Sequence, residues 1–99
     1  GRGMGETQNM ASSTDAYTLS DRSTWLSFGN KGNLTLLFQG DPPMFNQYGI
    51  ILVNPEIHPH VRAEDGQAFI DWMLSPVGQN LINSYKIHGE QAFFGNAQP

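Results

Sequence analysis

The sequence contains no cysteine. That absence excludes a disulfide framework, a zinc site with thiolate ligands and a cysteine nucleophile. Long apolar runs are absent as well, since none approaches the ~20 residues of a membrane-spanning helix. Residues 1–10, GRGMGETQNM, lack the apolar core of a signal peptide. The chain opens on Gly1 rather than on an initiator methionine, and we expect it to be a fragment of a longer chain.

Charged residues are scarce, at 14% of the chain, and the formal net charge is −4. The chain therefore lacks the basic field that recruits nucleic acid or an anionic membrane, and we expect no nucleic-acid partner. An acidic chain that binds an anion must use local dipoles, because its overall charge offers no attraction.

A catalytic set of residues is not recognisable either. His58, His60 and His88 have no serine or aspartate partner at a telling spacing, and the carboxylates mostly occupy expected helix starts. We therefore expect no enzymatic activity.

The segment His58-Pro59-His60 could supply two ligands to a metal only if a third ligand arrived from elsewhere. The proline is expected to hold the pair extended, with the two imidazoles on opposite sides. No nearby histidine or cysteine completes a set, so we expect no metal and no cofactor. Asn33-Leu34-Thr35, expected at a strand edge, is an N-glycosylation sequon that matters only in a eukaryotic host.

The sequence does contain enough apolar residues, 38% of the chain, for one domain with a modest core. A first helical pattern follows the glycine-rich residues 1–5 and is expected to break at residues 12–14; its weakly apolar face is formed by Met4, Thr7, Met10 and Ala11. A second helix is expected within residues 21–29, with Ser20 or Asp21 as its N-cap and Gly29 at its C′ position.

The strongest helical pattern covers residues 63–74, with an apolar stripe of Phe69, Ile70, Met73 and Leu74. Another helix is expected to start directly at Ser75-Pro76. Serine is a good N-cap, and a proline at the first helical position loses only an N–H that has no intrahelical partner. We expect these two helices to pack in succession on one surface.

Strands are expected at residues 16–20, 34–38 and 50–53, with an edge segment around residues 92–94. The last of the three, IILV, is apolar throughout, as in strands that a parallel sheet buries on both faces. The alternation of helices and strands predicts an α/β fold.

Three stretches resemble one family: AYTLSDRSTW (16–25), GDPPMFNQYGIILVNPEIHP (40–59) and FIDWMLSPVGQNLI (69–82). They are similar to the C-terminal part of the periplasmic tungstate-binding proteins of ABC transporters. These belong to the type II periplasmic solute-binding proteins, which include molybdate-binding proteins. The helix pair that closes the chain in that wider group is matched by Ala68, Phe69, Ile70, Asp71, Trp72, Ser75, Pro76, Gly78 and Gln79.

The resemblance implies a two-lobed α/β fold of the type II periplasmic-binding-protein kind, with the ligand between the lobes. Residues 1–48 would form the end of lobe two, and residues 49–99 the return crossover strand and the C-terminal helices of lobe one. It also implies a periplasmic or secreted location. The family's N-terminal motifs, a hydroxyl-rich turn and an S-R-G-D stretch, are absent from this sequence, and they supply much of the anion site.

Gly3, Met4 and Gly5 are the first candidate ligand-binding residues. Glycines let the backbone approach a ligand closely, and a helix start offers unpaired N–H groups and the positive end of the dipole. In molybdate-binding relatives, backbone amides at the equivalent helix start help to hold the oxyanion. The alternative is that this stretch is only a loop at the end of a fragment.

Tyr17, Thr18 and Ser20 are the second candidate set, because related proteins carry a hydroxyl-bearing residue facing the cleft near the end of this strand. For Ser20 and Asp21 the alternative is helix capping. Arg22 could pair with the anion, although an arginine in the first turn of a surface helix is more often solvated.

The resemblance implies an extracytoplasmic solute-binding protein that captures a tetrahedral oxyanion, tungstate or molybdate, for uptake through an ABC transporter permease. The alternative is a sensory or interaction module that keeps this fold without a transport role. Because a fragment would leave sheet edges exposed, we expect either a companion N-terminal polypeptide or a second copy that exchanges elements with the first.

Overall fold

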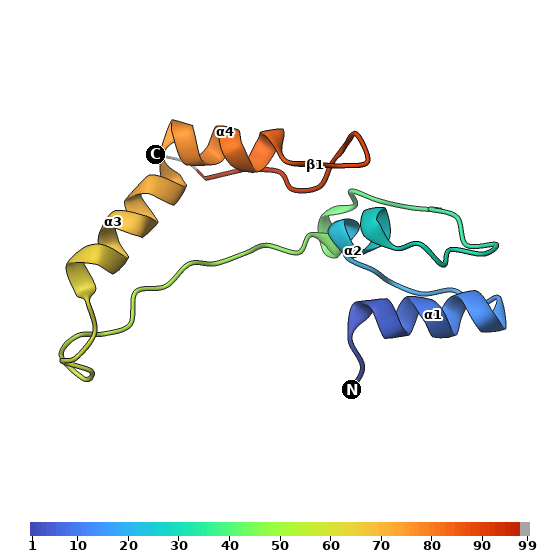
Figure 1. The fold of residues 1–99 in the computed structure, drawn as a ribbon, viewed down its shortest axis with the longest axis horizontal. Coiled ribbons are helices and arrows are strands. Elements are labelled where there is room, and N and C mark those ends of the chain that lie inside the picture. Colours follow the sequence, from blue (N-terminus) through green and yellow to red (C-terminus); the bar gives the residue numbers. More distant parts are fainter. Residues whose placement is uncertain (98–99) are drawn as a thin grey trace. The chain divides into compact units, whose positions relative to one another are not determined.

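The computed structural model describes residues 1–97, which divide into two compact units (Figure 1). Unit 1 consists of Gly1–Gln47 and Lys86–Ala92, and unit 2 consists of Tyr48–Tyr85 and the described residues from Phe93 onward. Each unit is described by itself below.

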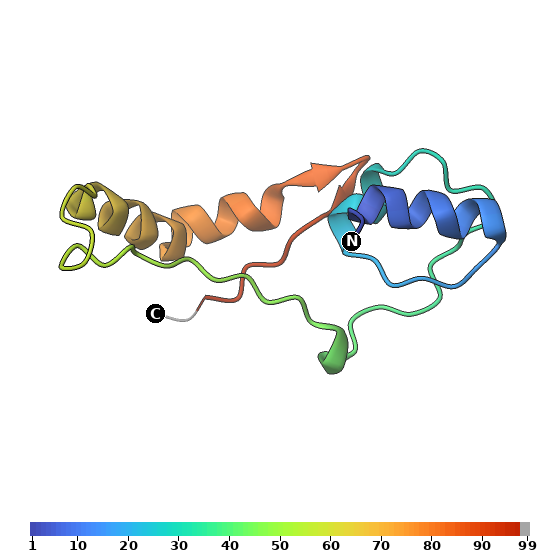
Figure 2. The same ribbon diagram turned by 90° about the horizontal axis from the view of Figure 1, so that it is seen from below.

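Unit 1 contains two α-helices, α1 (Met4–Thr14) and α2 (Arg22–Ser27), and a 3₁₀ turn, η1 (Pro42–Met44). It also contains a small antiparallel hairpin of β1 (Lys86–Ile87) and β2 (Glu90–Gln91), drawn as arrows in Figure 2. In the hairpin, Lys86 lies opposite Gln91 and Ile87 opposite Glu90. The two turn residues have positive φ, 50° and 81°, as tight hairpin turns require; they are His88 and Gly89.

Helix α1 forms where the first helical pattern predicts it and continues through Thr14. The hydroxyls of Ser13 and Thr14 donate to the Met10 carbonyl, at 3.2 and 2.7 Å, which keeps these polar residues in the helix. The helix ends at Asp15, whose φ of 52° is left-handed. The core of unit 1 is small, and its buried apolar residues are Ala11, Leu26 and Ala92.

Helix α2 starts at Asp21, one of the two N-caps that the sequence allows. The Asp21 carboxylate accepts from the Thr24 N–H at 2.9 Å and from the hydroxyls of Ser23 and Thr24 at 2.8 and 2.9 Å. Gly29 follows the C-cap Phe28, but φ is not positive there, so no left-handed cap forms.

The predicted strands are wrong for this structure. Residues 16–20, 34–38, 50–53 and 92–94 contain no strand, and within residues 1–97 the β1–β2 hairpin is the only sheet. A strand needs a neighbouring strand for its backbone N–H and C=O groups, and in the described chain residues 16–20, 34–38 and 50–53 are paired with no other strand. Several apolar side chains of residues 34–38 and 50–53 are exposed instead, by 76% at Phe38 and 88% at Ile51, whereas Ala92 is buried in the core of unit 1.

Unit 2 contains α3 (Ala63–Leu74) and α4 (Pro76–Ser84), which confirms both predicted helices and the corner between them. Ser75 caps both helices, because its hydroxyl donates to the Trp72 carbonyl at 2.6 Å and accepts from the Gly78 N–H at 3.3 Å. Pro76 occupies the first position of α4. No helix in residues 1–97 is long and apolar enough to span a bilayer.

Gln79 ties three segments of unit 2 together. Its amide nitrogen donates to the Met73 carbonyl at 2.8 Å, which satisfies one free carbonyl at the end of α3. Its amide oxygen accepts from the Ala97 N–H at 3.1 Å, and Asn83 similarly accepts from the Gly95 N–H at 2.7 Å. The last described residues are therefore held to α4 by side-chain amides.

Unit 2 has little hydrophobic core. None of its described large apolar side chains is fully buried, and Phe69, Trp72 and Leu81 are about half exposed. Phe69 and Trp72 stack on each other with ring centroids 6.4 Å apart. Phe93 contacts the rings of Tyr48 and Tyr85 at 6.0 and 6.2 Å.

Two loop expectations are also wrong. The segment around His58 and His60 is turned rather than extended, with the Val61 N–H bonded to the His58 carbonyl at 3.1 Å, and the two imidazoles meet edge to face at 6.1 Å. Asn33 lies in a turn, not at a strand edge. Its amide donates to the Asp15 carboxylate at 3.4 Å.

The Asp21 cap predicts a pH-dependent stability. Partial burial raises the pKa of the Asp21 carboxyl, but the hydrogen bonds from the Thr24 N–H and from the Ser23 and Thr24 hydroxyls outweigh it and leave the pKa below its ordinary value. A lowered pKa stabilises the folded state above the unfolded pKa, about 3.9, and this contribution is lost as the pH falls through the folded pKa. We expect Asp21→Ala to cost about 1 kcal/mol at neutral pH and less below about pH 4, measured by thermal unfolding.

Asp21→Asn is the matched control, since asparagine also caps but does not titrate. A difference between wild type and Asp21→Ala that stayed constant down to strongly acidic pH would contradict the cap.

The α3–α4 corner predicts that Gly78 cannot be enlarged. A Cβ there would collide with the Trp72 carbonyl oxygen and lie 2.8 Å from the Met73 carbonyl oxygen, both backbone atoms. We expect Gly78→Ala to destabilise the chain by about 1–3 kcal/mol through overpacking, which exceeds the roughly 1 kcal/mol that alanine gains in a helix. Chemical unfolding measures the difference. Asn80→Ala, on the exposed side of the same helix, should be neutral or slightly stabilising, and equal effects at both positions would refute the close approach.

Candidate functional site

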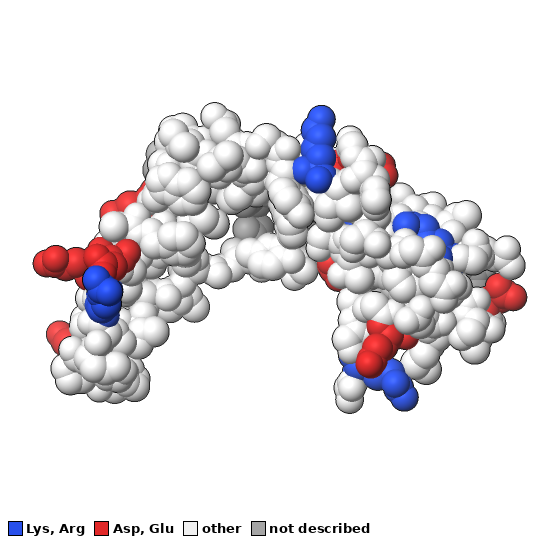
Figure 3. All heavy atoms as spheres, viewed as in Figure 1, with Lys and Arg blue, Asp and Glu red and all other residues white. Residues whose placement is uncertain are grey.

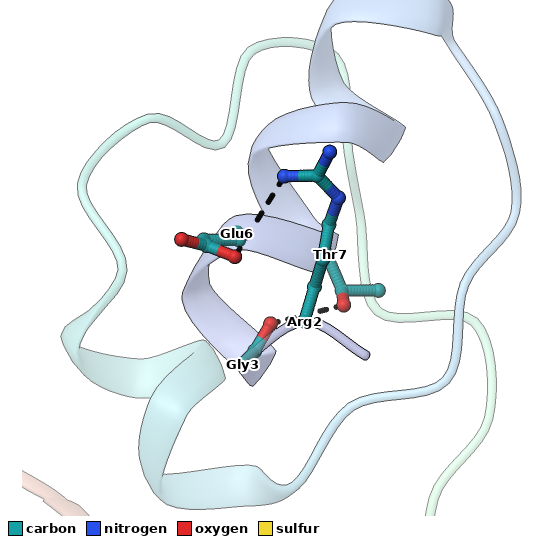
Figure 4. A network of polar contacts seen from close by, with 4 residues as sticks. All are labelled: Arg2, Gly3, Glu6 and Thr7. Atoms are coloured by element: carbon teal, nitrogen blue, oxygen red, sulfur yellow. Dashed lines mark hydrogen bonds and ion pairs between the residues drawn. The ribbon is translucent and has the colours of Figure 1, made fainter.

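The start of α1 presents free backbone donors. Gly3 is the N-cap, and its carbonyl accepts from both the N–H and the hydroxyl of Thr7, each at 3.0 Å (Figure 4). Among the described residues, the N–H groups of Met4, Gly5 and Glu6 have no acceptor, and no side chain caps them. Three unpaired donors and the positive end of the helix dipole therefore meet at this point.

The glycines at this helix start have no packing role in the described chain. A Cβ built on Gly3 or Gly5 would have no atom within 4 Å. A glycine inside a helix is less favourable than alanine by roughly 0.5–1 kcal/mol. Gly5 therefore lowers the stability of α1, although no neighbouring atom of the described chain requires a glycine there. The missing side chain leaves the backbone of this turn open to an approaching group.

The charges around the helix start nearly balance. Glu6 lies in the first turn of α1 and pairs with Arg2 at 3.8 Å, both side chains being mostly exposed (Figure 4). The Glu6 carboxylate opposes an anion at this place, and the Arg2 guanidinium offsets it. Charged groups are few on the face shown in Figure 3, and several acidic and basic side chains lie side by side there, as in the ion pair of Arg2 and Glu6.

Of the three hydroxyl-bearing candidates, the structure brings Ser20 against α1. The Ser20 hydroxyl accepts from the side-chain amide of Gln8 and donates to the Asp21 carbonyl at 2.8 Å. The Ala16 N–H is bonded to the Ala11 carbonyl, so the neighbouring Tyr17 lies toward the other end of the helix. Tyr17 is 90% exposed, and the Thr18 hydroxyl makes only a 3.4 Å contact to the adjacent carbonyl.

Gln8 is a residue that the sequence interpretation missed. Its side chain is completely buried, and it is the one buried polar side chain among the described residues. It shares the packed face of α1 with Met4 and Ala11, at the i, i+4 and i+7 positions of the helix. A glutamine in the middle of that face was the available signal.

Arg22 is not solvated, contrary to the expectation for a first-turn arginine. Its Nε donates to the Gln91 carbonyl at 2.7 Å and its Nη1 to the Gln39 side-chain oxygen at 2.9 Å. The guanidinium therefore ties α2 to β2 and to the loop that precedes η1. Within residues 1–97, no group of three or more His, Cys, Asp or Glu is placed to hold a metal ion.

Comparison with known proteins identifies relatives of nearly the whole chain. The sequence is 41% identical to the tungstate-binding protein TupA of Peptoclostridium acidaminophilum over 98% of this chain and 35% of that protein. It is also 40% identical, over 98% of this chain and 30% of the other, to a Haloferax volcanii protein that is named provisionally as an ABC transporter anion-binding protein. It is 28% identical to TupA of Campylobacter jejuni, over 99% and 38% of the two chains.

These matches confirm the resemblance to tungstate-binding proteins of ABC transporters. The relatives are described as binding proteins, not as enzymes, and the chain spans about a third of their length. No solved structure matches significantly. The model of the PBP superfamily domain matches residues 1–77, and the chain belongs to the PBP superfamily.

Proposed function

We propose that this chain is part of an extracytoplasmic solute-binding protein that captures tungstate or molybdate for an ABC transporter. The observation that carries the proposal is the open start of α1, where three N–H groups have no acceptor in the described chain and two glycines have no packing role. The 41% identity to a tungstate-binding protein over nearly the whole chain supports the choice of ligand.

The donors at this helix start suit a fully deprotonated tetrahedral oxyanion. Tungstate and molybdate present only acceptor oxygens, which match the N–H groups around Gly3, Met4 and Gly5. The hydroxyls of Tyr17, Thr18 and Ser20 are the second proposed donor set. A protonated anion would need an acceptor for its own proton, so a site built from neutral donors favours the unprotonated form.

Local dipoles must supply the attraction, since the formal net charge of the chain is −4. The end of a helix dipole carries about half of an elementary charge, and its effect grows when water is excluded. We propose that residues 1–48 contribute to lobe two and residues 49–99 to lobe one, and that closure of the two lobes desolvates the anion. No bond of the ligand is made or broken, and a permease receives the ligand.

The exposed apolar segments favour a polypeptide partner. Residues 34–38 and 50–53 have the composition of buried strands, yet their side chains include Phe38 and Ile51, among the most exposed apolar residues. Each segment needs a neighbouring strand to satisfy its backbone. We propose that either a companion polypeptide carrying the N-terminal part of the family fold or an exchanging second copy supplies it.

Binding of the anion is tested by isothermal titration of the assembled protein, meaning the chain together with the polypeptide that completes its fold, with sodium tungstate. We expect saturable binding, and we expect Gly5→Ala to weaken it because the new methyl group obstructs the approach to the backbone. The same change should raise the free energy of unfolding by up to about 1 kcal/mol, since alanine is the better helix former.

Gly29→Ala is the matched control, because Gly29 also has open space around it and lies in the same unit, away from the start of α1. Equal affinities for wild type and Gly5→Ala would place the anion elsewhere. An assembled protein that folds but binds neither tungstate nor molybdate would favour the sensory or interaction module.

Strand completion is tested by hydrogen exchange of the chain alone and with the companion polypeptide. We expect the amides of residues 34–38 and 50–53 to exchange quickly in the isolated chain and to become protected in the complex, because they then bond to neighbouring strands. The amides in the middle of α3 serve as the control, since their bonds are already formed within the helix. A stable 11.0 kDa monomer in light scattering, with these segments already protected, would contradict the proposal.

A further inference from the structure

The Gln8 side chain is placed where an apolar residue would fit better. It is fully buried between Met4 and Ala11 on the packed face of α1. Its amide nitrogen donates to the Ser20 hydroxyl, while its amide oxygen is buried without a hydrogen-bond donor in the described chain. A buried acceptor without a donor destabilises the folded state, and an apolar side chain of similar size would avoid that penalty.

Among the described residues, the one side-chain hydrogen bond of Gln8 joins α1 to Ser20, at the end of the second proposed donor set. Gln8 lies four residues, about 6 Å along the helix axis, from Met4 at the start of α1. Its partner Ser20 ends the hydroxyl-bearing segment and donates onward to the Asp21 carbonyl at 2.8 Å. Asp21 in turn caps α2 through the Thr24 N–H at 2.9 Å. The carboxamide of Gln8 therefore links α1 to the segment that leads into α2.

We propose that Gln8 is a positioning residue of the anion site, whose carboxamide fixes the distance between the N–H groups at the start of α1 and the segment Tyr17–Ser20. This inference rests on the function proposed above. Gln8 does not contact the ligand in this scheme. It holds Ser20, the last residue of the hydroxyl-bearing segment, against α1, so that this segment is already tied to the helix before the anion binds, and a preorganised site binds more tightly than a mobile one.

The test separates positioning from packing by replacing Gln8 with an apolar residue of similar size. Gln8→Met removes the unsatisfied oxygen and the bond to Ser20 but fills the same space. We expect the variant to unfold at the same temperature as wild type or at a higher one. We expect tungstate binding by the assembled protein to weaken by about tenfold, the scale of loss when an outer residue that orients a metal ligand is removed.

Two further variants sharpen the comparison. If Gln8 acts through Ser20, the double variant Gln8→Met with Ser20→Ala should bind tungstate no more weakly than the weaker single variant, because both remove the same link. Gln67→Met is the matched control, since Gln67 on exposed α3 donates to Asp71 at 2.9 Å in unit 2; its affinity for tungstate should equal that of wild type.

Each outcome decides the question. Wild-type affinity in Gln8→Met, or additive losses in the double variant, would overturn the positioning role while leaving the proposed function intact. If Gln8→Met both weakens tungstate binding and lowers the unfolding temperature, Gln8 is only a packing residue. If the assembled wild-type protein takes up no tungstate at all, the proposed function is wrong and the inference falls with it.

Discussion

The backbone hydrogen bond is the constraint on which the structure of this chain depends. A helix pairs its own N–H and C=O groups, whereas a strand must pair them with a neighbour. All four predicted helices therefore form, and the segments 16–20, 34–38 and 50–53 do not become strands. The two-residue strands β1 and β2 do form, because the chain reverses direction at His88 and Gly89 and each strand bonds to the backbone of the other.

Helix ends are the places where side chains complete this pairing. Asp21 satisfies the start of α2, and Ser75 closes the end of α3 while it starts α4. Gln79 then bonds the Met73 carbonyl, and Gly78 leaves room for the α3 backbone at the corner. The motif of Ser75, Pro76, Gly78 and Gln79 therefore has a structural role. It joins α3 to α4 without a loop and leaves few unpaired backbone N–H and C=O groups at the corner.

At the start of α1, in contrast, no side chain within residues 1–97 satisfies the free backbone N–H groups. The first N–H groups of α1 have no partner in the described chain. The Ser20 hydroxyl, which contacts Gln8 of the same helix, is already engaged, because it accepts from the Gln8 amide and donates to the Asp21 carbonyl. The unsatisfied oxygen of Gln8 lies in the same unit. Capping α1 and placing an apolar residue at position 8 would each stabilise the described chain, and the anion site proposed above would account for both departures.

The sequence by itself determined the helices, the corner at Ser75-Pro76 and the family, because caps, helical periodicity and motif spacing act over a few residues. It also limited the start of α2 to two candidates. Only the tertiary structure decided that Asp21 is the cap, that Arg22 reaches Gln39 and Gln91, and that Gln8 is buried against Ser20. The partners of Arg22 lie 17 and 69 residues away along the chain, and no local pattern encodes contacts at such separations. The strands could not be predicted for the same reason: their formation depends on partners far from them in sequence.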